Sequence, residues 1–74
     1  MQTNTLQTDP EYGSRRKRQA AVKSIHTRLL AIQAAEQKYL DNVPDNFQES
    51  ESFEAGENAV VVLDEIIDLL TEVY

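Results

Sequence analysis

The sequence predicts an all-α protein, an antiparallel helical hairpin that dimerises into a four-helix bundle. Only two glycines and two prolines interrupt its 74 residues. In both halves, apolar residues recur at alternating steps of three and four, which places them on one stripe of an α-helix. A short segment of turn-forming residues separates the halves. A chain of this length forms one domain at most, near the lower limit for an isolated hydrophobic core.

The first helix is expected over residues 14–41, after a flexible N-terminal arm at 1–13. Ser14 is a residue type that caps helix N-termini. Glu36 is the one charge on the apolar stripe, and we interpret it as snorkelling outward, with a role in fixing register as the alternative. The stripe consists of Val22, Ile25, Leu29, Ile32, Glu36 and Tyr39.

A loop is expected at 42–50 because Pro44 disfavours helix in the residue before it. A second helix should follow over about 51–73, capped by Ser50. Gly56 on its stripe indicates close approach of the two backbones, since glycine costs about 1 kcal/mol relative to alanine inside a helix. This stripe consists of Phe53, Gly56, Val60, Leu63, Ile67, Leu70 and Tyr74.

A second apolar row, formed by Ala59, Ile66 and Val73, lies beside the stripe of the second helix. The combined stripe is wider than one neighbouring helix covers, and a lone hairpin buries few side chains. We therefore expect a second copy, or a partner protein, to cover the row. The residues assigned to the core and dimer interface are Val22, Ile25, Leu29, Ile32, Tyr39, Phe53, Val60, Leu63, Ile66, Ile67, Leu70 and Val73.

Charge is divided unevenly along the chain. Residues 1–40 hold all seven bases and three acids, whereas residues 41–74 hold ten acids and no base, so their formal charges are +4 and −10. The sequence RRKR at 15–18 is the only dense basic run. In an antiparallel hairpin it lies beside the acidic end of the second helix, so we interpret it first as a charge match. Contact with a protein or RNA ranks second, and a nuclear signal last.

The sequence contains none of the motifs that carry enzyme chemistry, and we expect a non-enzyme without catalytic residues, metal or cofactor. It has no cysteine, and its single histidine, His26, lacks a partner for zinc binding or nucleophile activation. We assign His26 to packing at the flank of the stripe. The polar start lacks the apolar segment of a secretory signal, and the longest apolar run, Ala59–Leu63, is too short to span a bilayer. These features predict a soluble protein of the cytoplasm.

The segment EQKYLDNVPDNFQES and the acidic helix after it resemble small uncharacterised helical-hairpin proteins of bacterial phages and other mobile elements. The resemblance covers residues 36–70. It implies an origin in a prophage or mobile element and a bacterial host cytoplasm, and it supplies no catalytic or binding residues. The matching positions are Glu36, Gln37, Tyr39, Asn42, Pro44, Asn46, Gln48 and Ser50.

The predicted function is that of a small acidic protein-interaction module that binds and modulates or inhibits a host protein. A carboxylate-rich helix with exposed valine suits a basic protein surface, and the residues assigned to it are Glu57, Val61, Asp64, Glu65, Asp68 and Glu72. One alternative is a nucleic-acid-binding bundle that resembles the plasmid protein Rop in architecture and uses Arg15, Arg16, Lys17 and Arg18. Another is a purely structural bundle. The expected partners are a second copy and an unidentified host protein, with nucleic acid less favoured and no membrane.

Overall fold

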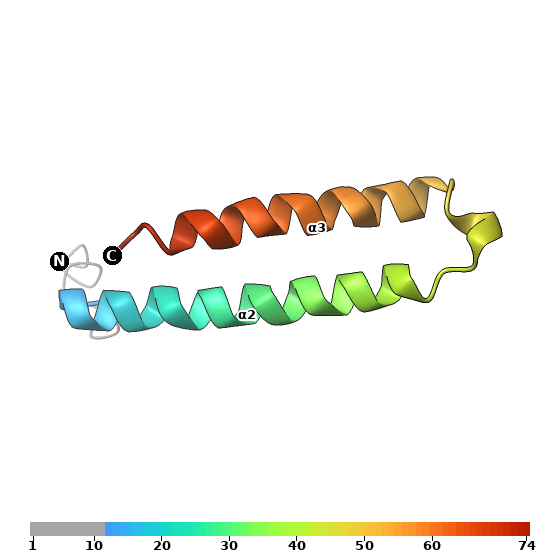
Figure 1. The fold of residues 1–74 in the computed structure, drawn as a ribbon. Helices are drawn as coiled ribbons and strands as arrows, with labels where there is room; N and C mark the ends of the chain where they lie inside the picture. Colours follow the sequence, from blue (N-terminus) through green and yellow to red (C-terminus); the bar gives the residue numbers. More distant parts are fainter. Residues whose placement is uncertain (1–11) are drawn as a thin grey trace, which may run out of the picture.

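A computed structural model describes residues 12–74, which form two long helices that lie side by side and run antiparallel (Figure 1). Helix α2 spans Arg15–Asp41 and helix α3 spans Glu51–Leu70. One 3₁₀ turn, η1, at Asp45–Phe47 lies in the connection between them. No strand occurs among residues 12–74, and the predicted helical hairpin is confirmed. Nearly all of the expected N-terminal arm lies outside the described residues.

Serine side chains begin both helices. The Ser14 Oγ accepts a hydrogen bond from the Lys17 backbone N–H at 3.1 Å, and the Ser50 Oγ accepts one from the Phe53 N–H at 3.2 Å. Each bond satisfies one backbone donor that the first helical turn leaves free. Both predicted caps are therefore confirmed. Helix α3 ends at Leu70, three residues before the expected boundary of 73.

The connection is held by its own backbone. The Val43 N–H donates to the Leu40 carbonyl at 3.2 Å, and the Phe47 N–H donates to the Pro44 carbonyl at 2.9 Å. The Gln48 side-chain amide adds a bond to the Val43 carbonyl at 3.3 Å. These local bonds turn the chain through the reversal that brings α3 back along α2.

The contact between the helices is a single narrow seam. Its buried members are Leu40, Phe53, Gly56 and Ile67. The other residues shielded in α2 are half-buried, namely Ala21, Val22, His26, Leu29, Gln33 and Glu36. Those in α3 are Ala59, Val60, Leu63 and Leu70. In α3 this is the predicted stripe together with Ala59.

Helix α2 is rotated relative to the orientation that its apolar stripe suggests. Three seam positions are taken by His26, Gln33 and Leu40, each one residue after an expected stripe residue. The Gln33 Nε2 donates to the Val60 carbonyl of α3 at 3.1 Å, which fixes this rotation by a bond between the helices. The displaced stripe residues Ile25, Ile32 and Tyr39 are 48, 54 and 49% exposed.

The two helices approach each other closely at Gly56. A Cβ atom at this position would lie 2.6 Å from the Glu36 Oε2 and 2.8 Å from the Leu40 Cδ2. The side chains of Glu36 and Leu40 therefore occupy the space that any larger residue at position 56 needs. This agrees with the close approach predicted from the glycine.

We expect Gly56→Leu to lower the stability of the hairpin by about 1–3 kcal/mol, because overpacking forces neighbouring side chains and backbones apart. Gly56→Ala should be nearly neutral, since its gain of about 1 kcal/mol in helix propensity offsets small shifts of the Glu36 and Leu40 side-chain ends. Thermal unfolding followed by circular dichroism measures both. Asn58→Leu, at an exposed position of the same helix, is the control. Equal midpoints for Gly56→Leu and Asn58→Leu would show that the close approach is unimportant.

Candidate interaction surfaces

Two shallow hollows open on one side of the hairpin. One is about 460 Å³ in volume and is lined by Gln19, Ala20, Val22, Lys23, His26, Leu70, Thr71 and Tyr74. The other, about 500 Å³, lies nearer the loop and is lined by Gln37, Leu40, Asp41, Gln48, Phe53, Glu57, Val60 and Val61. Lys23, Gln37 and Asp41 of α2 therefore point to the same side of the molecule as Glu57 and Val61 of α3.

The opposite side of the hairpin is apolar. Residues two apart on an α-helix point about 200° apart, so they lie on nearly opposite sides of the helix. Ile25 is two residues after Lys23, and Tyr39 is two residues from both Gln37 and Asp41. In α3, Ala59 is likewise two residues from both Glu57 and Val61. We define the apolar face as Ile25, Ile32 and Tyr39 of α2 with Ala59, Val62 and Ile66 of α3.

All residues of the apolar face except Ala59, which is half-buried at the seam, are exposed in the single chain. The exposed fractions of Val62 and Ile66 are 39 and 40%, and those of the three α2 residues are near one half. Val73, which follows α3, is 51% exposed. These exposed apolar side chains gather on one side of the hairpin, with the exposed Arg28 between Ile25 and Ile32, and apolar patches of this kind mark contact sites.

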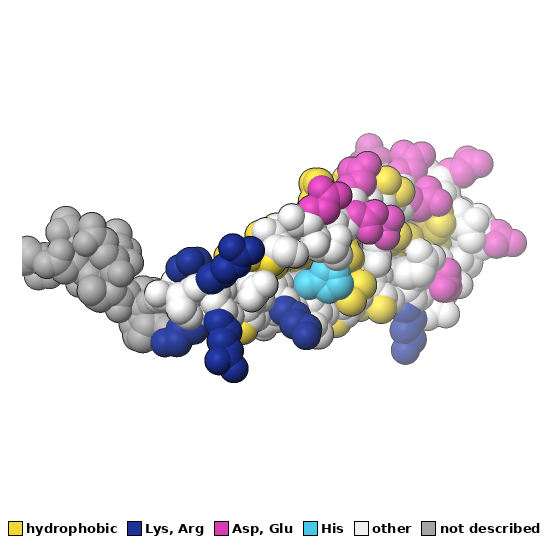
Figure 2. All heavy atoms as spheres, turned by 60° about the vertical axis from the view of Figure 1, so that its left-hand side comes forward, with side chains coloured by type: hydrophobic (Ala, Val, Ile, Leu, Met, Phe, Trp, Pro, Cys, Tyr) yellow, Lys and Arg dark blue, Asp and Glu magenta, His cyan; other side chains and the backbone are white. Residues whose placement is uncertain are grey.

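Acidic residues occupy the other exposed side of α3. We define the acidic surface as the six residues predicted for protein binding, Glu57, Val61, Asp64, Glu65, Asp68 and Glu72, all of which are exposed. Figure 2 views the side that carries His26 and shows the carboxylates gathered over α3. Val61 stands among them with 57% of its surface exposed. No basic residue occurs from position 41 onward, so α3 offers these acids no partner of its own.

The basic run, defined as Arg15–Arg18, lies at the first turn of α2 beside the end of α3 (Figures 1 and 2). The Arg15 guanidinium lies over the Tyr74 ring, 5.3 Å from its centroid, and the Arg18 Nη1 donates to the Tyr12 carbonyl at 2.9 Å. A guanidinium over an aromatic face is a cation–π contact. Neither contact is with a carboxylate.

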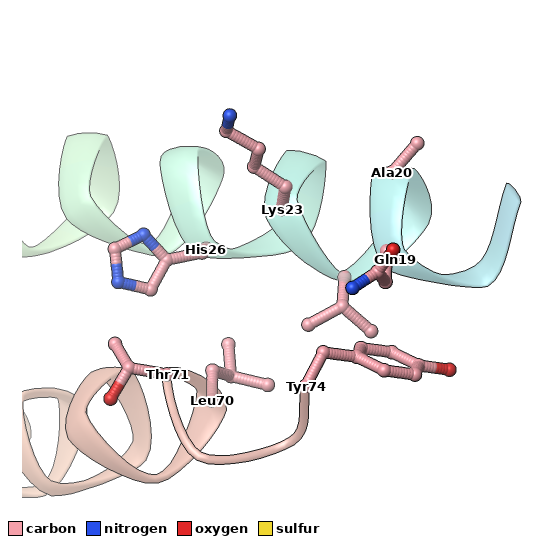
Figure 3. Close-up of a pocket in the computed structure, with 8 residues that line it drawn as sticks. Gln19, Ala20, Lys23, His26, Leu70, Thr71 and Tyr74 are labelled. Carbon is pink, nitrogen blue, oxygen red and sulfur yellow. The ribbon is translucent and has the colours of Figure 1, made fainter. Parts of the chain in front are cut away.

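His26 lies at the seam beside the first hollow. Figure 3 shows its ring pointing across from α2 toward Thr71, while the Lys23 amine points away from α3. Leu70 and the Tyr74 ring form the floor nearer the start of α2 (Figure 3). The hollow is wide and shallow, and its polar groups do not converge on one point as they do in a cofactor site.

Residues 12–74 contain no cluster of three or more histidine or acidic side chains arranged to hold a metal ion. Within the same span, neither helix combines the length and the apolar character needed to cross a bilayer.

Sequence reasoning predicted an uncovered apolar row on α3 but missed the exposure of Ile25, Ile32 and Tyr39 on α2. It also missed Gln33, whose bond to Val60 depends on the relative rotation of the helices. Comparison with known proteins adds no family to this description, because no family model, curated protein or solved structure matches the chain.

Proposed function

We propose that this protein is a non-enzymatic interaction module that dimerises through its apolar face and binds a basic protein surface through its acidic surface. The binding function is inferred from the carboxylate-rich surface around the exposed Val61. The helix that bears this surface contains no basic residue. The resemblance to phage and mobile-element proteins supports a host protein as the partner.

Self-association is supported by the direction in which the apolar residues point. At about 100° per residue, the α2 stripe from Val22 to Tyr39 is centred about 50° away from the direction of α3, on the side of the apolar face. The wide stripe of α3 is displaced by a similar angle toward the same side. In a four-helix bundle each helix points its apolar stripe between its two neighbours, toward the bundle axis. The displacement on both helices matches that geometry.

The size of the apolar face can be estimated from its length. It extends from Ile25 to Tyr39 along α2, about 21 Å at 1.5 Å per residue, and two helices side by side are roughly 20 Å wide. The face therefore offers on the order of 400 Å² in projection, about half of the roughly 800 Å² that each partner contributes to a standard interface.

Dimerisation through the apolar face leaves the acidic surface free, since the two lie on opposite sides of the hairpin. A dimer then presents two acidic surfaces on its outside. Concentrated negative charge speeds association with a basic partner, and the exposed Val61 supplies apolar contact once the surfaces meet.

The binding function predicts that Asp64→Asn, Glu65→Gln and Asp68→Asn together abolish capture of the partner. The experiment compares proteins retained from bacterial lysate by the immobilised wild-type chain and by this triple variant, with and without nuclease. The matched control is Asp45→Asn, Glu49→Gln and Glu51→Gln, which removes three charges at the loop. We expect a nuclease-resistant protein that the control variant retains and the acidic-surface variant loses.

The opposite pattern contradicts the proposal. If replacing the four bases of the basic run with glutamine abolishes capture and the acidic-surface variant retains it, then recognition lies on α2. Loss of capture on nuclease treatment would identify the ligand as nucleic acid. Circular dichroism of each variant establishes that helix content is unchanged.

A further inference from the structure

The two ends of the hairpin carry opposite charge. The open end, defined as residues 12–23 and 68–74, holds five bases and two acids, which gives a formal charge of +3. The loop end, defined as residues 36–57, holds seven acids and the single base Lys38, which gives −6. Figure 2 shows the bases gathered toward the start of α2 and the acids over α3 and the loop.

These ends act as separate charges. Helix α2 has 27 residues and is therefore about 40 Å long, whereas electrostatic interactions between exposed groups decay over about 8 Å at physiological salt. The ends of one hairpin are thus screened from each other. Each end responds only to the charges that a neighbouring molecule places beside it.

Two symmetric arrangements bring a pair of apolar faces together. With the two-fold axis parallel to the helices, open end meets open end and loop end meets loop end, so like charges adjoin at both ends. With the axis across the helices, each open end adjoins the loop end of the other copy. Both arrangements bury the same apolar residues, so charge decides between them, through the groups nearest the apolar face rather than through Lys23, Asp41 and Glu57 on the opposite side.

We infer that the apolar face is covered by a second copy in the antiparallel orientation, with the basic run of each copy beside the acidic loop end of the other. This inference rests on the dimerisation proposed above and adds its geometry. It also gives the basic run a role. The contacts of Arg15 and Arg18 within the chain leave Lys17 exposed and available to the acids of the other copy, whereas Arg16 shares the side of Lys23, away from the apolar face.

The same arrangement fixes the outer surface of the dimer. The two acidic surfaces lie on opposite sides of the bundle. The strongly acidic loop ends lie at opposite tips, and each lies beside the basic run of the other copy. In the parallel arrangement, one tip would carry both basic runs and form a single cationic site. The orientation therefore decides whether the two basic runs lie apart or form one paired basic surface.

Distances between spin labels test the orientation directly. The chain has no cysteine, so Gln19→Cys and Ser52→Cys each create one labelling position, near the open end and the loop end respectively, without changing charge. In antiparallel dimers of either variant the two labels are separated along the bundle by roughly 30 Å, estimated at 1.5 Å per residue. In mixed dimers of the two variants, the Gln19→Cys and Ser52→Cys labels lie at nearly the same level. Parallel dimers reverse both results and overturn the inference.

Neutralising the basic run gives a second readout with opposite signs for the two orientations. Replacing Arg15, Arg16, Lys17 and Arg18 with glutamine should weaken antiparallel dimers about tenfold, since each lost exposed pair has a small effect. In parallel dimers the same change removes repulsion and tightens association. Sedimentation at two salt concentrations measures the change, and the wild-type dimer should weaken as salt rises.

The possible results distinguish failure of the antiparallel orientation from failure of dimerisation itself. A folded monomer with no coupling between labels contradicts both dimerisation and orientation. A dimer with short distances between identical labels contradicts the antiparallel orientation alone.

Discussion

Ile66→Glu should abolish self-association and raise the dimer dissociation constant at least about a hundredfold. Ile66 lies on the apolar face and is 40% exposed in the single chain. In the dimer, the substitution places two unpaired carboxylates in an apolar interface, and a buried charge without a partner costs about 3–5 kcal/mol. Each 1.4 kcal/mol is about tenfold in affinity. Sedimentation equilibrium across a concentration series measures the effect.

Val61→Glu is the matched control for this variant. It introduces the same charge into the same helix, at a position that is 57% exposed on the opposite side. We expect it to leave the dimer intact. If Ile66→Glu and Val61→Glu associate equally well, the apolar face is not the interface.

Ile67→Ala should unfold the hairpin at ordinary temperatures or lower its stability by about 2–5 kcal/mol. Ile67 is 6% exposed and, with Leu40 and Phe53, is one of three buried apolar side chains among the described residues. Removing its outer carbons loses the transfer free energy and leaves a cavity between helices that meet along one seam. Chemical denaturation monitored by circular dichroism gives the change.

The control for the buried position is Val61→Ala, which removes apolar atoms from an exposed site of the same helix. Its free energy of unfolding should stay within about 0.5 kcal/mol of the wild type. A similar small effect for Ile67→Ala would mean that α2 and α3 do not pack through the observed seam.

Much of the hairpin is determined by local features of the sequence. Ser14 and Ser50 cap the helices as predicted because capping depends on a side chain and a backbone donor three residues away. Pro44 and the polar residues around it place the reversal for similarly local reasons. The position of Gly56 also follows from sequence, since its cost in a helix indicates close packing.

The rotation of α2 could not be read from periodicity. The heptad pattern gives the average direction of all apolar neighbours, and α2 has α3 on one side and an open apolar face on another. Ile25 and Ile32 satisfy the pattern but lie to one side of the seam with α3, and each is about half exposed. Gln33 contacts α3 instead, through a hydrogen bond to the Val60 carbonyl. This bond depends on how the two helices are placed in three dimensions. A single-sequence pattern therefore predicts the apolar side of a helix but not which of its residues face the neighbouring helix.

The side-chain contacts of the basic run could not be read from the sequence for a similar reason. The sequence places Arg15–Arg18 beside the acids at the end of α3, which suggested a charge match within the chain. The structure instead records Arg15 on the Tyr74 ring and Arg18 on the Tyr12 carbonyl. Which groups a long cationic side chain contacts depends on rotamers that sequence position does not set.

Sedimentation equilibrium of the wild-type chain at micromolar concentration, at the salt concentration of a cell, tests the central claim most directly. One chain has a mass of 8.4 kDa. A second copy covering the apolar face predicts twice that mass, with helical content and cooperative unfolding that depend on protein concentration. A folded species at the mass of one chain, whose thermal midpoint does not change with concentration, would contradict the claim.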